Sequence, residues 1–344
     1  MSDFTEIDPK TTEGLLAAIG TAHSVVVTAH EFPDGDAVGS ALALSSFLRK
    51  IGKDVQLVLP HRQIGIGSIL EGAETIVDAE NFDFSRRPDL LCCLDCSERS
   101  RICDRRFLAW LDDRCPCINI DHHGKQLFGD WNCVIRDFSS TGELVYRLAL
   151  KAGWEMDRVI AEALWMALVT DTNRFSKPAC TPETLRCAAD LAGCGARVGW
   201  LNDMIYSQDT WNNVQLRKRV YDSLRLLCNG AVALASLERR DFEETGCVKQ
   251  DAAEFPLIPF GIQGVKVAAL IYLPPDSDKV RVSLRSRPGP LPCAKAIAEH
   301  FGGSGHEDSA GAAVADSVAN VCADFSSYME KLCSNLDNAR GTNK

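Results

Sequence analysis

The sequence predicts an α/β protein: an N-terminal domain built on a mostly parallel sheet, and a smaller mixed α/β C-terminal domain. Two observations carry this prediction. Through the first half of the chain, short β-branched runs alternate with segments of helical periodicity, and several runs are apolar throughout, as in strands buried on both faces. Beyond residue 231, strand-like runs follow one another, separated by glycine, proline and aspartate.

Strands and helices are predicted alternately along the first half of the chain. The run SVVVTAH at residues 24–30 is rich in β-branched residues and stops at Pro33. Residues 37–50 have helical periodicity, and Gly52 follows as a stop signal. The alternation then continues with strands at 54–59, 89–95 and 117–120 and helices at 140–152 and 159–170.

The second half has a different pattern of predicted elements. The charged stretch at 195–230 is predicted to be a connecting helix, and strands are predicted at 231–237, 265–273 and 280–286. A helix at 293–301 precedes a glycine-rich loop. At about 150 residues per domain, a chain of 344 residues predicts roughly two domains. We therefore expect an N-terminal domain at 1–195, a helical connector at 196–235 and a C-terminal domain at 236–344.

Composition and charge exclude several classes of protein. Apolar residues make up 46% and charged residues 24%, which excludes disorder, collagen and a coiled coil. We find no apolar run long enough to span a membrane and no basic segment typical of a signal peptide, so we expect a cytoplasmic protein without a membrane partner. The net charge of −10 argues against a long duplex but allows a small anionic ligand in a locally basic pocket. The sequence leaves open whether the chain forms a homo-oligomer.

The fifteen cysteines are expected to be reduced thiols, because no export signal is present. Cys93 and Cys96 form a CxxC pair, but no second pair follows at the spacing of a zinc ribbon. Cys92, Cys93 and Cys117 lie in strand-like runs, where a free cysteine behaves as a small hydrophobe. We therefore favour core packing over a metal or redox role for them.

Histidine and aspartate clusters follow four of the predicted elements. Three of them follow strands, and parallel strands bring their carboxyl ends to one crevice. In the helix at 159–170, Leu164, Leu168 and the following Asp171 share a face, which points Asp171 toward the sheet. Each cluster alone is compatible with a turn or a helix cap, but four together favour a site. The six candidate ligands are His30, Asp34, Asp36, Asp95, His122 and Asp171.

Two histidines and four carboxylates form a mixed oxygen and nitrogen ligand set. This set suits Mn²⁺ or Mg²⁺, with Co²⁺ also compatible, and the absence of thiolates disfavours structural zinc. Six ligands are many for one ion and natural for two. Two ions roughly 3.5–4 Å apart, bridged by one carboxylate, form a hydrolytic centre.

The motifs HEFPDGDAVGS, CLDCSERSRI, NIDHH, SSTGELVY and LVTDTNRF resemble the successive motifs of the DHH phosphoesterase superfamily. The later VSLRS and FGGSGHEDSAG resemble motifs of its DHH-associated substrate-binding domain. The resemblance covers about residues 15–330 and is closest to the nanoRNase/pAp phosphatase (NrnA-type) branch. It implies two lobes, two Mn²⁺ ions and hydrolysis of phosphoester bonds in short oligonucleotides and 3′-phosphoadenosine 5′-phosphate (pAp).

The resemblance also implies residue roles. One ion would be held by His30, Asp34 and Asp95, and the other by Asp36, Asp95, His122 and Asp171, with Asp95 as the bridge. Asp121 would orient a histidine from outside the ligand set. His123 would face the substrate phosphate, and Arg101 matches an arginine of the second family motif.

A charge count predicts a second layer of binding residues. Four ligand carboxylates and two divalent ions sum to about zero, so attraction for phosphate needs added cations. Arg285, with Ser283 and Ser286, is the expected guanidinium fork. Backbone N–H groups of the glycine run are expected to bind an anion; the residues concerned are Gly302, Gly303, Gly305 and His306. Ser304, Ser309 and Asn173 depart from the family pattern without removing a predicted ligand.

The sequence therefore predicts a metal-dependent phosphoesterase acting on short oligonucleotides, such as linear dinucleotides, with a phosphatase side activity on pAp. Its C-terminal domain would bind the terminal nucleotide in a cleft between the lobes. A DHH pyrophosphatase or exopolyphosphatase, a RecJ-like exonuclease and a cyclic-dinucleotide phosphodiesterase are the enzymatic alternatives. The alternative of another class is a non-catalytic nucleotide sensor.

Overall fold

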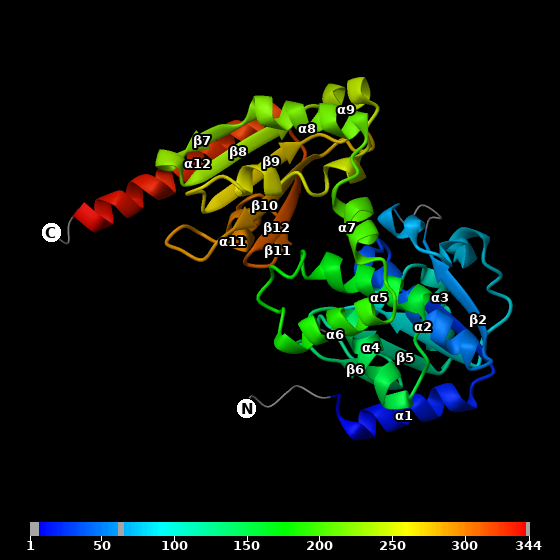
Figure 1. The fold of residues 1–344 in the computed structure, drawn as a ribbon. Coiled ribbons are helices and arrows are strands. Elements are labelled where there is room, and N and C mark those ends of the chain that lie inside the picture. The colour runs from blue at the N-terminus through cyan, green and yellow to red at the C-terminus, as the bar shows by residue number, and fades with distance from the viewer. Residues whose placement is uncertain (1–6, 61–64, 125, 342–344) are drawn as a thin grey trace. The chain divides into compact units, whose positions relative to one another are not determined.

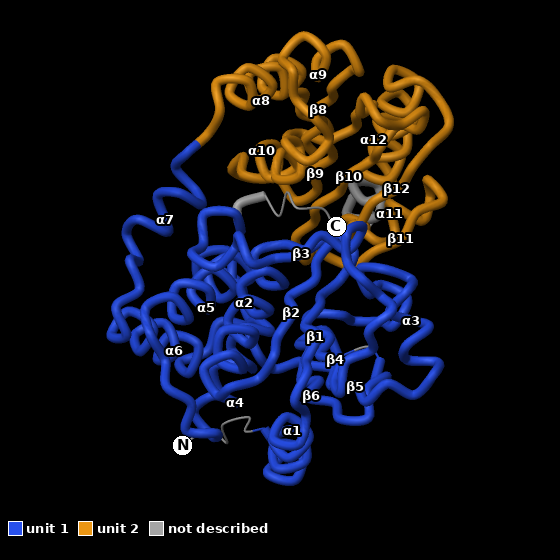
Figure 2. Tube along the Cα trace, turned by 90° about the vertical axis from the view of Figure 1, so that its right-hand side faces the viewer, with its two compact units in different colours: residues 1–208 blue, residues 209–344 orange. Residues whose placement is uncertain are grey.

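A computed structural model describes residues 7–60, 65–124 and 126–341 of the chain. The chain divides into two compact units, residues 1–208 and 209–344, coloured separately in Figure 2. Each unit has its own sheet and its own core, so each is described by itself.

The first unit is built on a six-stranded sheet in the order β3-β2-β1-β4-β5-β6. Figure 1 labels β2, β5 and β6, and Figure 2 labels all six strands. Every neighbouring pair is parallel, which confirms the predicted mostly parallel sheet. The strands are β1 (Ser24–Thr28), β2 (Asp54–Leu59), β3 (Ile76–Asp78), β4 (Leu90–Leu94), β5 (Cys117–Asp121) and β6 (Trp131–Val134).

Helices cover both faces of this sheet, because successive side chains of each strand point to opposite faces. Val25 and Val27 of β1 face a large core, whereas Val26 faces a smaller aromatic core with Phe107 and Trp110 of α3 (Arg105–Asp112). The large core is covered by α1 (Pro9–Thr21), α2 (Gly35–Lys50), α4 (Thr141–Ala152), α5 (Arg158–Asp171), α6 (Pro182–Gly193) and α7 (Val198–Tyr206).

The close packing of α2 on α5 depends on Gly39. A Cβ atom at this position would lie 2.3 Å from the carbonyl oxygen of Ala163 and 2.9 Å from the nitrogen of Ala167. A larger side chain would therefore push the two helices apart. Because Asp36 lies one turn before Gly39 and Asp171 ends α5, this approach also sets the separation of two candidate ligands.

The second unit contains a mixed six-stranded sheet in the order β11-β12-β10-β9-β8-β7. Strands β8 and β9 are parallel and the other pairs are antiparallel, as the predicted mixed α/β domain requires. The strands are β7 (Arg225–Leu227), β8 (Val232–Leu237), β9 (Val267–Tyr272), β10 (Val280–Ser286), β11 (Ser304–Gly305) and β12 (Ser309–Val314).

One face of the second sheet packs on α11 (Ala294–His300) and α12 (Val318–Gly341). The other face packs on α8 (Trp211–Ser223) and α9 (Arg239–Thr245), with α10 (Leu257–Phe260) nearby. Side chains of β10 alternate strictly between the two faces of this sheet. Val280, Val282 and Leu284 are buried against α11 and α12, whereas Arg281, Ser283 and Arg285 are half-buried on the opposite face.

The stretch expected to be a separate helical connector, 196–235, is divided between the two units. Helix α7 belongs to the first unit and α8 to the second, with the division after residue 208. Strands β7 and β8 then enter the second sheet. The reason is packing: Leu201 of α7 is buried in the first core, and Leu216 and Val220 of α8 are buried in the second unit.

Cys92, Cys93 and Cys117 are fully buried in the two cores of the first unit, which confirms the core packing predicted for them. A hydrogen bond with Cys117, together with burial, raises the pKa of Cys93 well above its usual range. Burial likewise raises the pKa of Cys96. Both side chains of the CxxC pair are therefore neutral thiols in a dry environment.

The expectation that every cysteine is a free thiol is wrong for two residues. Cys228, beside β7, and Cys333 of α12 form a disulfide across 105 positions of sequence, with Cα atoms 6.0 Å apart. This separation lies inside the usual range for a disulfide. The pair ties the last helix to the edge of the second sheet, and its sequence separation gives no local signal.

We therefore expect 13 titratable thiols in the protein denatured without reductant, and all 15 after reduction. Ellman titration under both conditions checks this count, and peptide mapping should recover the Cys228–Cys333 link. Fifteen thiols in the unreduced, freshly purified protein would contradict the pairing.

Among the helices of the described residues, none combines the length and the apolar character that crossing a bilayer requires.

Candidate metal centre

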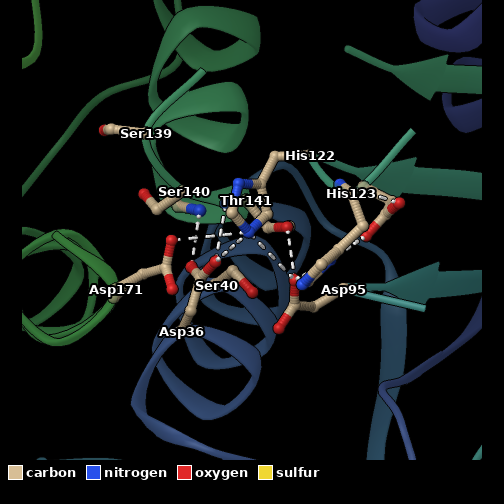
Figure 3. Close-up of polar contacts among 12 residues, drawn as sticks. Asp36, Ser40, Asp95, His122, His123, Ser139, Ser140, Thr141 and Asp171 are labelled. Carbon is tan, nitrogen blue, oxygen red and sulfur yellow. Dashed lines mark hydrogen bonds and ion pairs between the residues drawn. The ribbon is translucent and has the colours of Figure 1, made fainter. Parts of the chain in front are cut away.

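Strand ends of the first sheet bring the predicted site residues together. His30 lies two residues beyond β1, Asp95 directly follows β4, and Asp121 is the last residue of β5. Asp36 comes from the first turn of α2 and Asp171 from the end of α5. Figure 3 shows Asp36, Asp95, Asp171 and His122 turned toward one another from these elements.

Asp36 is fully buried at the N-terminus of α4. Its two carboxylate oxygens accept hydrogen bonds from the backbone N–H groups of Thr141 (2.7 Å) and Gly142 (2.9 Å). These are N–H groups that the first turn of a helix leaves without an intrahelical partner. Even so, burial and the nearby charges of Asp95 and Asp171 raise the pKa of Asp36 well above its usual range. Several carboxylates packed this closely need a cation to stay ionised.

Asp95 occupies a strained position. Its backbone φ is +56°, in the left-handed region that costs a non-glycine residue about 1–2 kcal/mol. Such strain is commonly retained where the surrounding structure holds a functional side chain. Burial would raise the pKa of Asp95, but the hydrogen bond from His30 and the proximity of His123 and His122 outweigh it and lower the pKa to about 2.

His122 supplies the clearest sign that a cation belongs here. Its Nδ1 lies 3.2 Å from the carbonyl oxygen of Phe138, which can only accept a hydrogen bond, so Nδ1 carries the proton. Its Nε2 is buried without a hydrogen-bond partner among the described residues. This nitrogen lies 3.5–3.8 Å from oxygens of three carboxylates, those of Asp171, Asp36 and Asp95. A lone pair facing carboxylate oxygens is unfavourable unless a positive ion lies among them.

Potential ligand atoms within 4.8 Å of one another form three groups in the described chain. These groups are His30, Asp34 and Asp95; Asp36, His122 and Asp171; and Asp95, His122 and His123. They contain every ligand expected from the sequence, and Asp95 and His122 each belong to two of them. The donor set therefore fits divalent metal ions, which prefer carboxylate oxygen and imidazole nitrogen in such mixtures.

Asp121 is buried behind His123. Its carboxylate accepts hydrogen bonds from Nδ1 of His123 (2.8 Å), from the backbone nitrogen of the same residue (3.0 Å) and from that of Gly124 (3.2 Å). The hydrogen bond that His123 donates to Asp121 raises the pKa of His123, and the charge of Asp95 adds to this effect against that of burial. The expected orienting aspartate therefore acts on His123. Because Nδ1 is occupied, Nε2 is the nitrogen left for a ligand.

Arg101 lies in a short 3₁₀ segment after Asp95. Its carbonyl oxygen accepts a hydrogen bond from the backbone of Glu31 (2.8 Å), which ties the segment after β4 to the loop after β1. Its guanidinium is 3.5 Å from the hydroxyl of Ser97. The structure places Arg101 at the same sheet edge as the candidate ligands.

In the second unit, Ser283 and Arg285 share the half-buried face of β10. Burial lowers the pKa of Arg285, while the charge of Asp308 opposes this effect. One guanidinium nitrogen donates to the carbonyl oxygen of Leu284 at 2.9 Å. His306 is exposed at the end of the glycine run. Ser283 also contacts the hydroxyl of Tyr272, and the substrate contacts expected for these three residues stay a prediction.

Ser286 does not fit the substrate contact expected for it. It lies next to Arg285 on the strand and therefore points to the opposite face. Its buried hydroxyl accepts from the backbone nitrogen of Ala294 (2.8 Å) and donates to the carbonyl oxygen of Glu307 (2.6 Å). Ser286 thus joins the start of α11 to the loop before β12.

The glycine run also differs from the expected anion cradle. The N–H groups of Gly302, Gly303 and His306 already donate to carbonyl oxygens of Glu299, Ala298 and Ser309. A Cβ atom on Gly303 would lie 2.2 Å from the carbonyl oxygen of Gly311, so this glycine is required for the approach to β12. Gly305 pairs with Ala310 in the same short ladder. Close packing therefore accounts for Gly303 and Gly305, and the left-handed backbone of Gly302, with φ +71°, accounts for that glycine.

Two residues at the cluster were missed by the sequence reasoning. Thr141 contacts two candidate ligands, although the motif in which it lies, SSTGELVY, gives its side chain no role by spacing. Lys177 places its ammonium nitrogen 3.1 Å from Asp171, six residues along the chain. Both contacts depend on how α4 and the loop after α5 pack, which leaves no local signal.

The chain is similar to proteins of the DHH family. The profile of the DHH family, N-terminal domain, matches residues 24–168. The bifunctional oligoribonuclease and PAP phosphatase NrnA of Thermus thermophilus is 30% identical over 292 residues, covering 84% of this chain and 83% of that protein. The NrnA of Bacillus subtilis is 26% identical over 325 residues, covering 93% of this chain and 97% of that protein.

A solved structure shares the fold over most of the chain. The exopolyphosphatase-related protein of Bacteroides fragilis superimposes with a TM-score of 0.85 at 24% identity, covering 96% of this chain and all of that one. At this level of identity the likeness concerns the fold, and the α/β architecture of both sheets is confirmed by it.

Proposed function

The chain belongs to the DHH family of phosphoesterases, in its NrnA-type branch, and from this premise we propose that it hydrolyses phosphodiester bonds of short oligonucleotides with the help of divalent metal ions. The dephosphorylation of pAp is proposed as a second activity of the same site. The observation that carries the proposal is the buried Nε2 of His122, which has no hydrogen-bond partner in the described chain and lies among three carboxylates. The relatives named as oligoribonucleases and PAP phosphatases support the substrate class.

Two divalent ions are proposed to bind, with Mn²⁺ as the first candidate and Mg²⁺ or Co²⁺ compatible with the same ligands. His30, Asp34 and Asp95 would hold one ion. Asp36, Asp95, His122 and Asp171 would hold the other. When bound, such ions polarise a phosphoryl group and lower the pKa of water.

The chain's own residues orient the substrate and balance its charge. Asp121 fixes the ring of His123 through Nδ1, and in the protonated ring Nε2 would donate to an oxygen of the scissile phosphate. Arg101, held at the same sheet edge, contributes positive charge. Because the ligand carboxylates and two divalent ions sum to about zero, these side chains supply the net attraction for a phosphate.

The second unit is proposed to bind the part of the substrate that does not react. Arg285 would contact a terminal phosphate through two parallel hydrogen bonds, which a planar guanidinium makes better than an ammonium. Ser283 and His306 would contribute polar contacts beside it. Contacts made equally in the ground and transition states lower KM without raising kcat, so they would select the substrate rather than accelerate bond cleavage.

A substrate panel tests the proposed function. With saturating Mn²⁺, we expect turnover of linear 5′-phosphorylated dinucleotides and of pAp, and much slower turnover of longer RNA, cyclic dinucleotides and pyrophosphate. Preference for pyrophosphate or cyclic dinucleotides would instead favour those phosphohydrolase activities. Tight nucleotide binding in a metal-loaded protein without turnover of any substrate would identify a sensor and overturn the proposal.

A further inference from the structure

The segment Ser139–Glu143 starts α4 directly beside the candidate metal centre and is almost entirely buried. The exposed fractions of Ser139, Ser140, Thr141 and Glu143 are between 0% and 2%. It belongs to the motif SSTGELVY, whose side chains have no place among the proposed ligands. Burying this many polar groups is costly unless each has a defined partner.

Thr141 contacts two of the ligands (Figure 3), and within this segment its hydroxyl is the side-chain group that reaches one of them. Its hydroxyl donates to Oδ1 of Asp95 at 2.9 Å. Its backbone nitrogen donates to Oδ2 of Asp36 at 2.7 Å. A single residue therefore restrains carboxylates from two different elements, the end of β4 and the first turn of α2.

The hydroxyl of Thr141 distinguishes the two oxygens of Asp95. Oδ1, which accepts from Thr141, lies 3.8 Å from Nε2 of His122, whereas Oδ2 lies 3.5 Å from Nε2 of His30. The rotation of this carboxylate determines which oxygen faces which histidine.

Thr141 is in turn held by its neighbours. The hydroxyl of Ser140 caps the helix by accepting from the backbone nitrogen of Glu143 at 3.0 Å. The carboxylate of Glu143 accepts from the hydroxyls of Ser139 (2.6 Å) and Thr184 of α6 (2.9 Å). The start of α4 is thereby fixed to α6, so the donor groups of Thr141 are directed by a rigid support.

We propose that Thr141 is a positioning residue that orients the carboxylates of Asp95 and Asp36 and thereby sets the affinity for the ion held by Asp36, Asp95, His122 and Asp171. The inference rests on the proposed metal-dependent function. Groups that hydrogen-bond to metal ligands typically change metal affinity by about 10–100-fold when they are removed. The hydroxyl acts on the ligand and never contacts the reacting phosphate.

The test compares variants of the full chain by calorimetric titration with Mn²⁺ after removal of bound metal. Thr141→Val keeps the shape and the backbone N–H but loses the hydroxyl, and we expect one of two Mn²⁺ sites to weaken by about 10–100-fold. Thr141→Ser restores the hydroxyl and should bind both ions with near-wild-type affinity. Thr141→Ala, which adds no bulk, should reproduce the loss and serves if the valine variant does not fold.

Thr28→Val is the matched control, since Thr28 is equally buried and its hydroxyl contacts the thiol of Cys103 at 3.1 Å. It should bind both ions as the wild type does. If the wild type binds two ions and a folded Thr141→Val or Thr141→Ala variant binds them with unchanged affinity, the positioning role of Thr141 is overturned and the proposed function is not. A wild-type protein that binds no Mn²⁺ would overturn both this role and the proposed function.

Discussion

Replacing Asp95 by alanine is expected to abolish phosphodiester hydrolysis and to reduce bound metal from two ions per chain to one or none. One carboxylate at this position is proposed to serve both ions, and its two oxygens face different histidines. Its loss removes a ligand from each site at once. Metal content by mass spectrometry of the dialysed protein, measured beside turnover of a dinucleotide, checks the expectation.

Asp95→Asn separates charge from backbone conformation, because asparagine also tolerates the left-handed region that Asp95 occupies. It should lose activity as the alanine variant does. Asp89→Asn is the matched control and should leave turnover unchanged: Asp89 precedes β4 at the opposite end, where its carboxylate accepts hydrogen bonds from the backbone nitrogens of His23 and Ser24. Near-wild-type turnover of either Asp95 variant at any Mn²⁺ concentration would refute the two-ion assignment.

Arg285→Lys and His306→Ala are expected to raise KM for 5′-phosphorylated dinucleotides more than they lower kcat. Lysine keeps the charge of Arg285 but loses the paired donors of the guanidinium. Loss of a contact made equally in the ground and transition states raises KM and spares kcat. Charge-assisted hydrogen bonds contribute roughly 1.5–3 kcal/mol each, so kcat/KM should fall by about tenfold to a hundredfold.

The controls distinguish substrate selection from chemistry. Arg281→Lys changes an arginine on the same half-buried face of β10, four residues away, that is not among the proposed substrate contacts, and should leave KM close to that of the wild type. Turnover of a small generic phosphodiester should hardly change in any of these variants. Equal losses on the generic and dinucleotide substrates would place Arg285 and His306 in the chemical step.

The first sheet could be predicted because its central strands are buried on both faces. Continuous short apolar runs such as those of β4 and β5 are typical of such strands when they alternate with helices along the chain. The edge strands β3 and β6, of three and four residues, carry no such signal. Their pairing depends on neighbours that are distant in sequence.

The candidate ligands could be predicted for a related reason. Parallel strands gather their carboxyl ends at one edge, so polar clusters after β1, β4 and β5 must lie near one another. The positions of Thr141 and Lys177 follow instead from the packing of α4 and of the loop after α5, which local sequence does not determine. The same limit applies to the Cys228–Cys333 pair.

Ser286 is an instructive exception, because the strand pattern itself contained the correction. Residues 285 and 286 are adjacent in a predicted strand, so their side chains could not both face one ligand. The motif resemblance suggested a shared role, whereas the period of two assigns Ser286 to the buried face, where its hydroxyl joins Ala294 to Glu307.

The metal dependence of dinucleotide hydrolysis tests the central claim most directly. Protein stripped with a chelator should have no turnover of a 5′-phosphorylated diribonucleotide, and activity should return with added Mn²⁺ and reach its plateau as two ions bind per chain. Full turnover by the stripped protein would contradict the account, as would two bound ions without hydrolysis.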